Sequence, residues 1–328
     1  MRFASSRRRI LEILPWTAIP VVAGCSQAID PKVPEPIRSY VDPEFGRPYL
    51  LYRPSSYNAE RAWPLVVACA ASFPDSPNRQ IRAWDQFAES PGFLVLAPEL
   101  GGKSKSDSSP ASKHLERQRN DESQILAALQ HVRGAHSISE DRIFIHGSGA
   151  GAAAALRTGL LHPELFRAVT LTDPRFDEAF LTDAGGGIDP YQPVQVCYKG
   201  SDAVTGKDGG RCVEWLRAHG ADVRDDSIGP RRSGDLSKSL AFLEDICRRP
   251  WVRIRAFPQP NAASLDFQFK LQCSFVPKAF RWEFGDGDTS PVAQPIHRYA
   301  APGTYVVSVA VDEPGGKTQA RTLRLRVQ

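Results

Sequence analysis

The residues best suited to chemistry lie in RIFIHGSGAGAAAAL, residues 142–156. Ser148 stands in a glycine-rich turn between an apolar segment and an alanine-rich segment, and His146 precedes it by two residues. A serine hydroxyl attacks a carbonyl only when a neighbouring base removes its proton, and histidine is the usual base. Acyl transfer is therefore the first chemistry to consider, and the surrounding elements decide whether it is supported.

The spacing of the glycines resembles the GxSxG elbow of the α/β-hydrolases, a sharp turn from strand to helix that presents the nucleophilic serine. If Gly147 is the first glycine of that motif, Gly151 is the last and the nucleophile position falls on Gly149. Glycine has no side chain that could attack a carbonyl. In this register the resemblance implies that covalent catalysis cannot start at the elbow.

A register shifted by one residue offers Ser148 as the nucleophile instead. It places His146 and Ala150 where the elbow requires glycines, and crowding at a strained turn disfavours it. An atypical esterase would combine Ser148 with His146 or His162 as the base and with Asp202 as the acid. This alternative stays open.

The resemblance extends over residues 46–249. Four further segments correspond in order to parts of the polyhydroxybutyrate-depolymerase and feruloyl-esterase-like branch of the fold: RPYLLYRP, PLVVACAAS, GFLVLAP and HPELFRAV. Apolar runs of strand length alternate with helical patterns in this region, which independently favours a parallel sheet covered on both faces. We expect an α/β domain with a doubly wound, mostly parallel sheet.

The other triad positions also depart from the family pattern. The family's acid would follow a late strand, where this chain has Asp202. The family's histidine should follow DVRDDSI, but the next segment, GPRRSGDLS, contains none, and His219 lies in the preceding helix. The His-Gly pair that usually shapes the oxyanion hole is replaced by Ala70 and Ala71. Three separate departures predict a hydrolase-like domain without a working triad.

A ligand site can survive at such a turn without catalysis. Backbone N–H groups and the positive end of the helix dipole favour an anionic or carbonyl ligand there. We expect this pocket to be lined by Gly147, Ser148, Gly149, Ala150, Ala70 and Ala71. No cofactor is predicted, and no group of cysteines and histidines has the spacing of a zinc site.

Residues 252–328 change to a period of two. Segments such as TYVVSVAV and RTLRLRV alternate, and GDGD and EPGGK mark turns, which predicts a small antiparallel sandwich. FRWEFGDGDTS, PIHRY and APGTYVVSVAVDE resemble the PKD (polycystic kidney disease) domain, an immunoglobulin-like module. We interpret the acidic turn at 285–288 as turn geometry and predict no metal, because a calcium site needs six or more oxygen ligands.

Residues 1–24 have the pattern of an export signal. Basic residues precede an apolar run that ends in VVAGC, and this end resembles the lipobox of bacterial lipoproteins. The resemblance implies that Cys25 is lipidated, with membrane lipid as its partner, and that residues 25–45 form a tether. SRRRIL also resembles the twin-arginine motif, which implies export of a folded chain. We expect a membrane-anchored protein that faces the periplasm or the cell exterior.

Composition narrows the function further. Four arginines of the export signal account for much of the net charge of +4, so the body has no basic excess that would favour nucleic acid. Disulfide pairing stays open among Cys69, Cys197, Cys212, Cys247 and Cys273. We expect extracytoplasmic binding or scaffolding, with a glycan, a polymer or a surface protein as partner. An atypical serine esterase and a purely structural surface protein are the alternatives.

Overall fold

A computed structural model of the chain describes residues 36–70, 76–101, 111–182, 188–200, 204–228, 236–259 and 265–327. The predicted export signal, Cys25 and most of the predicted tether lie outside these residues. Among the helices that are described, none is both long enough and apolar enough to cross a membrane.

The folded body begins before residue 46. Ile37–Val41 forms strand β1, which pairs antiparallel with β2, Pro48–Tyr52. Asp42 closes the connection, because its carboxylate accepts hydrogen bonds from the amides of Phe45 at 2.7 Å and Arg47 at 2.8 Å. Residues 37–45 therefore belong to the body and not to the tether, which corrects the predicted boundary.

Eight strands form one sheet in the order β1-β2-β4-β3-β5-β6-β7-β8. β2 pairs antiparallel with β1 and β4, and the remaining neighbours are parallel, which confirms the predicted doubly wound, mostly parallel sheet. β3 and β4 are buried along their whole length, as expected for strands covered on both faces. The bounds are Trp63–Ala70 (β3), Leu94–Pro98 (β4), Ile138–Ser148 (β5), Ala168–Thr172 (β6), Pro193–Lys199 (β7) and Asp222–Ile228 (β8).

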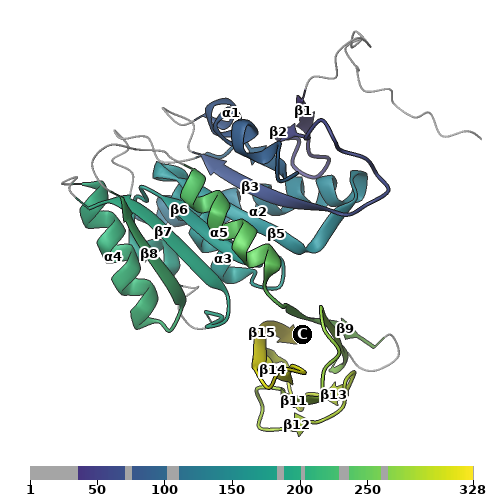
Figure 1. Ribbon diagram of the computed structural model, residues 1–328. Coiled ribbons are helices and arrows are strands. Elements are labelled where there is room, and N and C mark those ends of the chain that lie inside the picture. The colour runs from purple at the N-terminus through teal and green to yellow at the C-terminus, as the bar shows by residue number, and fades with distance from the viewer. Residues whose placement is uncertain are drawn as a thin grey trace, which may run out of the picture. The chain divides into compact units, whose positions relative to one another are not determined.

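Helices cover both faces of this sheet (Figure 1). Their bounds are Pro77–Ala88 (α1), Ala111–Ala135 (α2), Ala152–Leu161 (α3), Thr205–Ala218 (α4) and Ser237–Arg248 (α5). α2, α3 and α4 share a hydrophobic core with Leu65 of β3, whereas α1 and α5 share a second core with Val66 of the same strand. Neighbouring side chains of a strand point to opposite faces, so one apolar strand contributes to both cores. The carboxyl ends of the parallel strands remain as the edge where a site can form.

Two antiparallel sheets form the C-terminal sandwich, in the orders β13-β10-β9 and β12-β11-β14-β15. Their core contains Phe269, Trp282 and Tyr299, which are fully buried. The structure confirms the predicted small all-β module. The bounds are Val252–Pro258 (β9), Asp266–Cys273 (β10), Ala279–Glu283 (β11), Thr289–Ser290 (β12), Ile296–Arg298 (β13), Gly303–Asp312 (β14) and Thr318–Val327 (β15).

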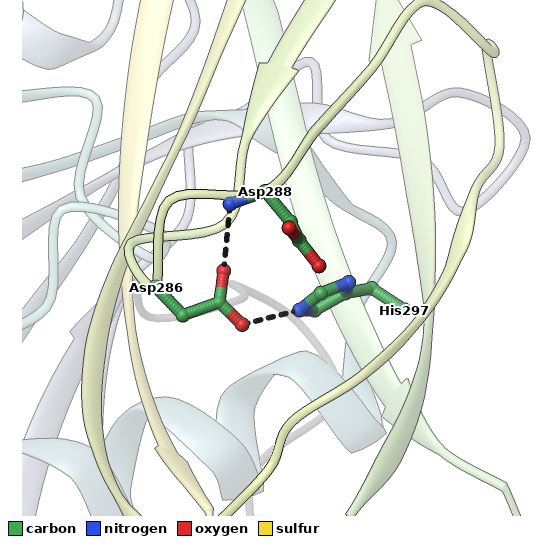
Figure 2. Close-up of side chains that lie close together, drawn as sticks. All are labelled: Asp286, Asp288 and His297. Carbon is green, nitrogen blue, oxygen red and sulfur yellow. Dashed lines mark hydrogen bonds and ion pairs between the residues drawn. The ribbon is translucent and has the colours of Figure 1, made fainter.

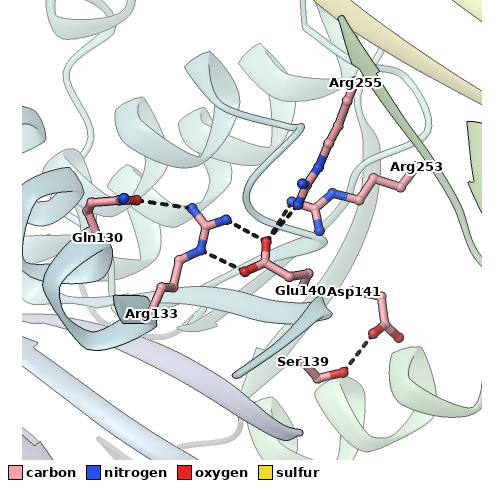
Figure 3. Close-up of polar contacts among 7 residues, drawn as sticks. All are labelled: Gln130, Arg133, Ser139, Glu140, Asp141, Arg253 and Arg255. Carbon is pink, nitrogen blue, oxygen red and sulfur yellow. Dashed lines mark hydrogen bonds and ion pairs between the residues drawn. The ribbon is translucent and has the colours of Figure 1, made fainter. Parts of the chain in front are cut away.

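Glu140, near the start of β5, binds three guanidinium groups (Figure 3). Its Oε2 lies 2.6 Å from Arg133 of α2 and 3.0 Å from both Arg253 and Arg255 of β9. Burial raises the pKa of Glu140, but its hydrogen bonds and ion pairs with these arginines outweigh burial and hold the pKa below its usual value. One carboxylate thus pairs with three cations, of which Arg253 is only 9% exposed.

The cysteines of the described residues are free thiols. Cys69, Cys197 and Cys212 are buried, and Cys247 and Cys273 are half-buried. Burial raises the pKa of Cys197 and of Cys212 to about 12. No disulfide joins any of these five residues in the structure.

Candidate functional site

The chain turns from β5 into α3 at Gly149. Ser148, the last residue of β5, has an extended backbone with φ −120° and ψ 137°, whereas Gly149 has a left-handed φ of +54°. Hydrolase elbows place the nucleophile on a strained strand-to-helix turn, and a left-handed φ is uncommon for residues other than glycine. The left-handed residue of the turn is therefore Gly149, whereas Ser148 still has the extended backbone of the strand.

Gly147 and Gly151 allow α3 to lie close against the sheet. A Cβ atom on Gly147 would lie 2.6 Å from the Cα of Ala152, and one on Gly151 would lie 2.5 Å from the carbonyl oxygen of Cys69. Both distances are well inside van der Waals contact, so neither position accepts a side chain without movement of the backbone. The turn and its packing therefore explain the glycine spacing without any catalytic role.

His146 is directed to a neighbouring strand rather than to Ser148. Its Nδ1 lies 2.9 Å from Oγ1 of Thr170 on β6, and its ring meets Trp84 of α1 edge-on with the centroids 5.1 Å apart. Burial lowers the pKa of this imidazole to about 3, so it is neutral. Nε2 of His146 is buried and has no hydrogen-bond partner among the described residues, so His146 makes no hydrogen bond with Ser148 of the kind that a general base needs.

His162, the other histidine considered as a base, lies just beyond the C-terminal end of α3. The turn at Gly149 is at the opposite end of this helix, about 15 Å away. Nε2 of His162 lies 2.9 Å from Glu122, and Nδ1 lies 3.2 Å from Glu164. Burial lowers the pKa of His162, but the two carboxylates outweigh burial and raise it to about 9. A protonated imidazole that binds two carboxylates cannot accept a proton from Ser148.

The charge on His162 predicts a pH-dependent stability. The pKa is raised from 6.5 to about 9 on folding, so the stabilisation is fully present below pH 6.5 and is lost as the pH rises through 9. A shift of this size, reduced by solvent screening, corresponds to about 1–2 kcal/mol. We expect the free energy of unfolding in urea to fall between pH 6.5 and pH 9, and His162→Gln to remove most of that fall.

His136→Gln is the control for this prediction, because burial lowers the pKa of His136, so its shift cannot produce a fall in stability as the pH rises. The control should keep the pH dependence of the unmodified chain. An unchanged slope in the His162→Gln protein would contradict the assignment of this charge to His162.

The other histidines with described side chains also have partners other than a serine hydroxyl. The chain has seven histidines, and the side chain of His114 lies outside the described residues. The remaining contacts are those of His131 with Tyr49, His136 with Tyr57, His219 with the carbonyl of Trp215, and His297 with Asp286. Among the six described imidazoles, therefore, none is hydrogen-bonded to a serine.

The carboxyl edge of the sheet brings two predicted residues together. Ala70 and Ser148 are partners in the parallel register of β3 and β5, so they end neighbouring strands side by side. Ala71 and Asp202, which were predicted to lie at the same edge, are outside the described residues. Of the residues predicted to line the pocket, the structure describes those of the glycine turn, Ala150 and Ala70.

Asp173 places a further carboxylate at this edge of the sheet. The sequence alone did not indicate it. It follows β6 and has a left-handed φ of 46°, and its carboxylate accepts a hydrogen bond from the amide of Lys199 at 3.2 Å. Two residues later, the amide of Arg175 donates to the carbonyl oxygen of Gly149 at 3.0 Å. The signal for this turn was an aspartate between an apolar run and a proline, in LTDP. The contact with Lys199 gives this carboxylate a role in closing the turn between strands.

Comparisons with known proteins agree with the two parts of the chain. Residues 249–327 match the family model of the PKD domain. Esterase PE8 is similar in structure with a TM-score of 0.47 at 18% identity, over 57% of this chain and 94% of that one. The CE1 ferulic acid esterase AmCE1/Fae1A from Anaeromyces mucronatus has a TM-score of 0.47 at 14% identity, over 67% of this chain and 93% of that one.

The C-terminal module has structural relatives of its own. The PKD1 domain of the Vibrio cholerae metalloprotease PrtV is similar with a TM-score of 0.22 at 22% identity, over 24% of this chain and 96% of that one. A search of curated protein sequences found no match.

Proposed function

We propose that this chain, in which an esterase-like α/β-hydrolase fold precedes a PKD domain, is an exported lipoprotein that binds or scaffolds a partner and does not hydrolyse esters. The observation that carries this proposal is the left-handed Gly149 at the turn where a hydrolase holds its nucleophile. A covalent mechanism needs a side chain at that point, and glycine has none. The turn has a left-handed residue at this position, but that residue has no side-chain oxygen that could attack an ester.

The contacts of the histidines support the same proposal. General-base catalysis requires an imidazole within hydrogen-bond reach of the hydroxyl. His146 is hydrogen-bonded to Thr170 on the neighbouring strand, and two carboxylates stabilise the protonated form of His162. Ser148, half-buried at the end of β5, thus has no base from either of the histidines considered for it.

The same turn is where we place a ligand. Gly147, Gly149 and Ala150 bring backbone close to the start of α3, a helix of ten residues whose dipole favours negative charge at that end. A carboxylate, an ester carbonyl or the oxygen of a glycan would suit such a place. Lipid attached to Cys25 would hold the body at a membrane face, where a glycan, a polymer or a surface protein is within reach.

A fluorophosphonate probe tests the loss of catalysis, because it reacts only with an activated serine. We expect no labelling of purified residues 26–328 and no turnover of p-nitrophenyl acetate above the buffer rate. Gly149→Ser, which returns a hydroxyl to the nucleophile position, should stay silent as well, since no base is supplied. Labelling and turnover that disappear in Ser148→Ala would overturn the proposal and make the chain an atypical serine esterase.

Thermal unfolding of the same preparation tests binding. A carboxylate, glycan or ester that binds the folded chain raises its melting temperature, by an amount that grows with the ratio of ligand concentration to Kd. Absence of a shift with all three classes would remove the ligand pocket from the proposal and leave a purely structural surface protein.

A further inference from the structure

Three metal-ligating side chains converge at one end of the C-terminal sandwich (Figure 2). Asp286 and Asp288 lie in the turn between β11 and β12, and His297 lies in β13. One ligand atom from each residue lies within 4.8 Å of the others. We propose that Asp286, Asp288 and His297 form a binding site for a divalent transition metal of the zinc class.

His297 is already positioned for this role. Its Nε2 lies 2.7 Å from Oδ2 of Asp286. Its ring stacks on Phe284 with the centroids 4.1 Å apart and meets Tyr299 edge-on at 4.6 Å. The side chain is only 8% exposed, so the imidazole cannot swing away from the turn. A metal bound at Nε2 would replace the hydrogen bond that now joins the imidazole to the carboxylate of Asp286.

The turn that presents the two carboxylates is equally constrained. Asp286 accepts the amide N–H of Asp288 through Oδ1 at 3.2 Å, which leaves Oδ2 directed to His297. Gly285 and Gly287 have left-handed φ values of +85° and +103°. A Cβ atom on Gly285 would lie 2.7 Å from the carbonyl oxygen of Val306, so the turn lies directly on β14.

The charges of the cluster favour a cation. Asp286 accepts hydrogen bonds from His297 through Oδ2 and from the amide of Asp288 through Oδ1, so both oxygens of its carboxylate face donors. Asp288 adds a second carboxylate beside the same imidazole, and it is exposed, so its side chain can rotate to approach an ion.

The ligand set selects the kind of metal. One imidazole nitrogen with two carboxylate oxygens suits Zn²⁺ and its transition-metal neighbours, whereas Ca²⁺ takes six to eight oxygens. Ligand atoms around a tetrahedral Zn²⁺ lie about 3.4 Å apart, given bonds of about 2.1 Å. To reach that spacing, Nε2 of His297 and Oδ2 of Asp286 would separate from 2.7 Å, and the exposed Asp288 would approach from within 4.8 Å. A fourth position would be left for water.

Such a site would connect the two sheets of the sandwich. The turn that contains Asp286 and Asp288 joins β11 to β12 in the four-stranded sheet, and His297 belongs to β13 in the three-stranded sheet. Metal binding would add a link between sheets that otherwise meet through their hydrophobic core, and it would stabilise the folded state more as the metal concentration rises above Kd.

Titration with Co²⁺ and Zn²⁺ tests the proposal on the full-length chain purified in detergent and stripped with EDTA. We expect one equivalent of Co²⁺ to produce the visible absorption of a nitrogen- and oxygen-ligated ion, which Zn²⁺ abolishes. We expect saturating Zn²⁺ to raise the melting temperature of the C-terminal module by about 5 °C. Absence of a saturable Co²⁺ spectrum would overturn the proposal.

Two matched variants separate this site from adventitious binding. Asp288→Asn removes an exposed carboxylate and leaves the contact between Asp286 and His297 in place, so the metal-free melting temperature should not change. Its Co²⁺ affinity should fall at least tenfold. Asp312→Asn makes the same charge change at the opposite end of β14, where Asp312 pairs with Ala279, and should bind Co²⁺ normally. Equal affinities in the two variants would refute the site.

Discussion

We expect Gly151→Ala to lower the free energy of unfolding by about 3 kcal/mol. The added methyl group would lie 2.5 Å from the carbonyl oxygen of Cys69 and 2.7 Å from the Cα of Ala70. Both are backbone atoms of β3, a fully buried strand in the middle of the sheet, so they cannot move aside without disturbing its neighbours. The measurement is urea unfolding of the variant and of the unmodified chain.

Gly210→Ala is the control for this prediction. Gly210 lies inside α4, and an added Cβ would meet nothing within 4 Å. Alanine is the better residue inside a helix, so this variant should gain about 0.5–1 kcal/mol. Similar effects of the two substitutions would show that α3 does not pack on β3 as closely as described.

We expect Glu140→Gln to lower the free energy of unfolding by about 2–3 kcal/mol. The substitution keeps the shape of the side chain but removes the charge that faces Arg133, Arg253 and Arg255. Arg253 accounts for most of the expected loss in stability, because it is 9% exposed and its Nε and Nη1 have no partner among the described residues. A buried cation that loses its counter-charge destabilises the fold more than an exposed one. Exposure of the Glu140 side chain to solvent, at 36%, keeps the effect at the lower end of the usual range.

Asp245→Asn provides the matched comparison for Glu140→Gln. Asp245 pairs with Arg249 at 2.6 Å, but both side chains are more than 40% exposed, so we expect a loss of less than about 1 kcal/mol. Arg253→Met in the Glu140→Gln background should recover part of the lost stability, because it removes the unpaired cation. Equal losses for Glu140→Gln and Asp245→Asn would refute the role given to burial of Arg253.

The central strands could be predicted because their sequences are apolar without interruption. PLVVACA and LVLAP become β3 and β4, buried on both faces. β1 was missed because IRSYV is only partly buried at the edge of the sheet and follows a proline-rich stretch. The start of α2 likewise carries no apolar signal, since ASKHLERQ is almost entirely polar.

The candidate site could be predicted only where it depends on local backbone. The spacing of Gly147, Gly149 and Gly151 located the turn, because a strand-to-helix elbow imposes that spacing on the chain itself. The partners of His146 and Asp173 depend on β6 and β7, which are distant in sequence. Nothing in the sequence around Thr170 or Lys199 indicates these contacts, so they become visible only in the folded chain.

Burial alone protects Cys69, Cys197 and Cys212 from oxidants. The reactive form of cysteine is the thiolate, and burial raises the pKa of each of these thiols, so they stay protonated in the folded chain. An unfolded chain exposes all of them, and an oxidising compartment would then pair or modify them at random. A chain that folds before it meets such a compartment arrives with these sulfurs already out of reach.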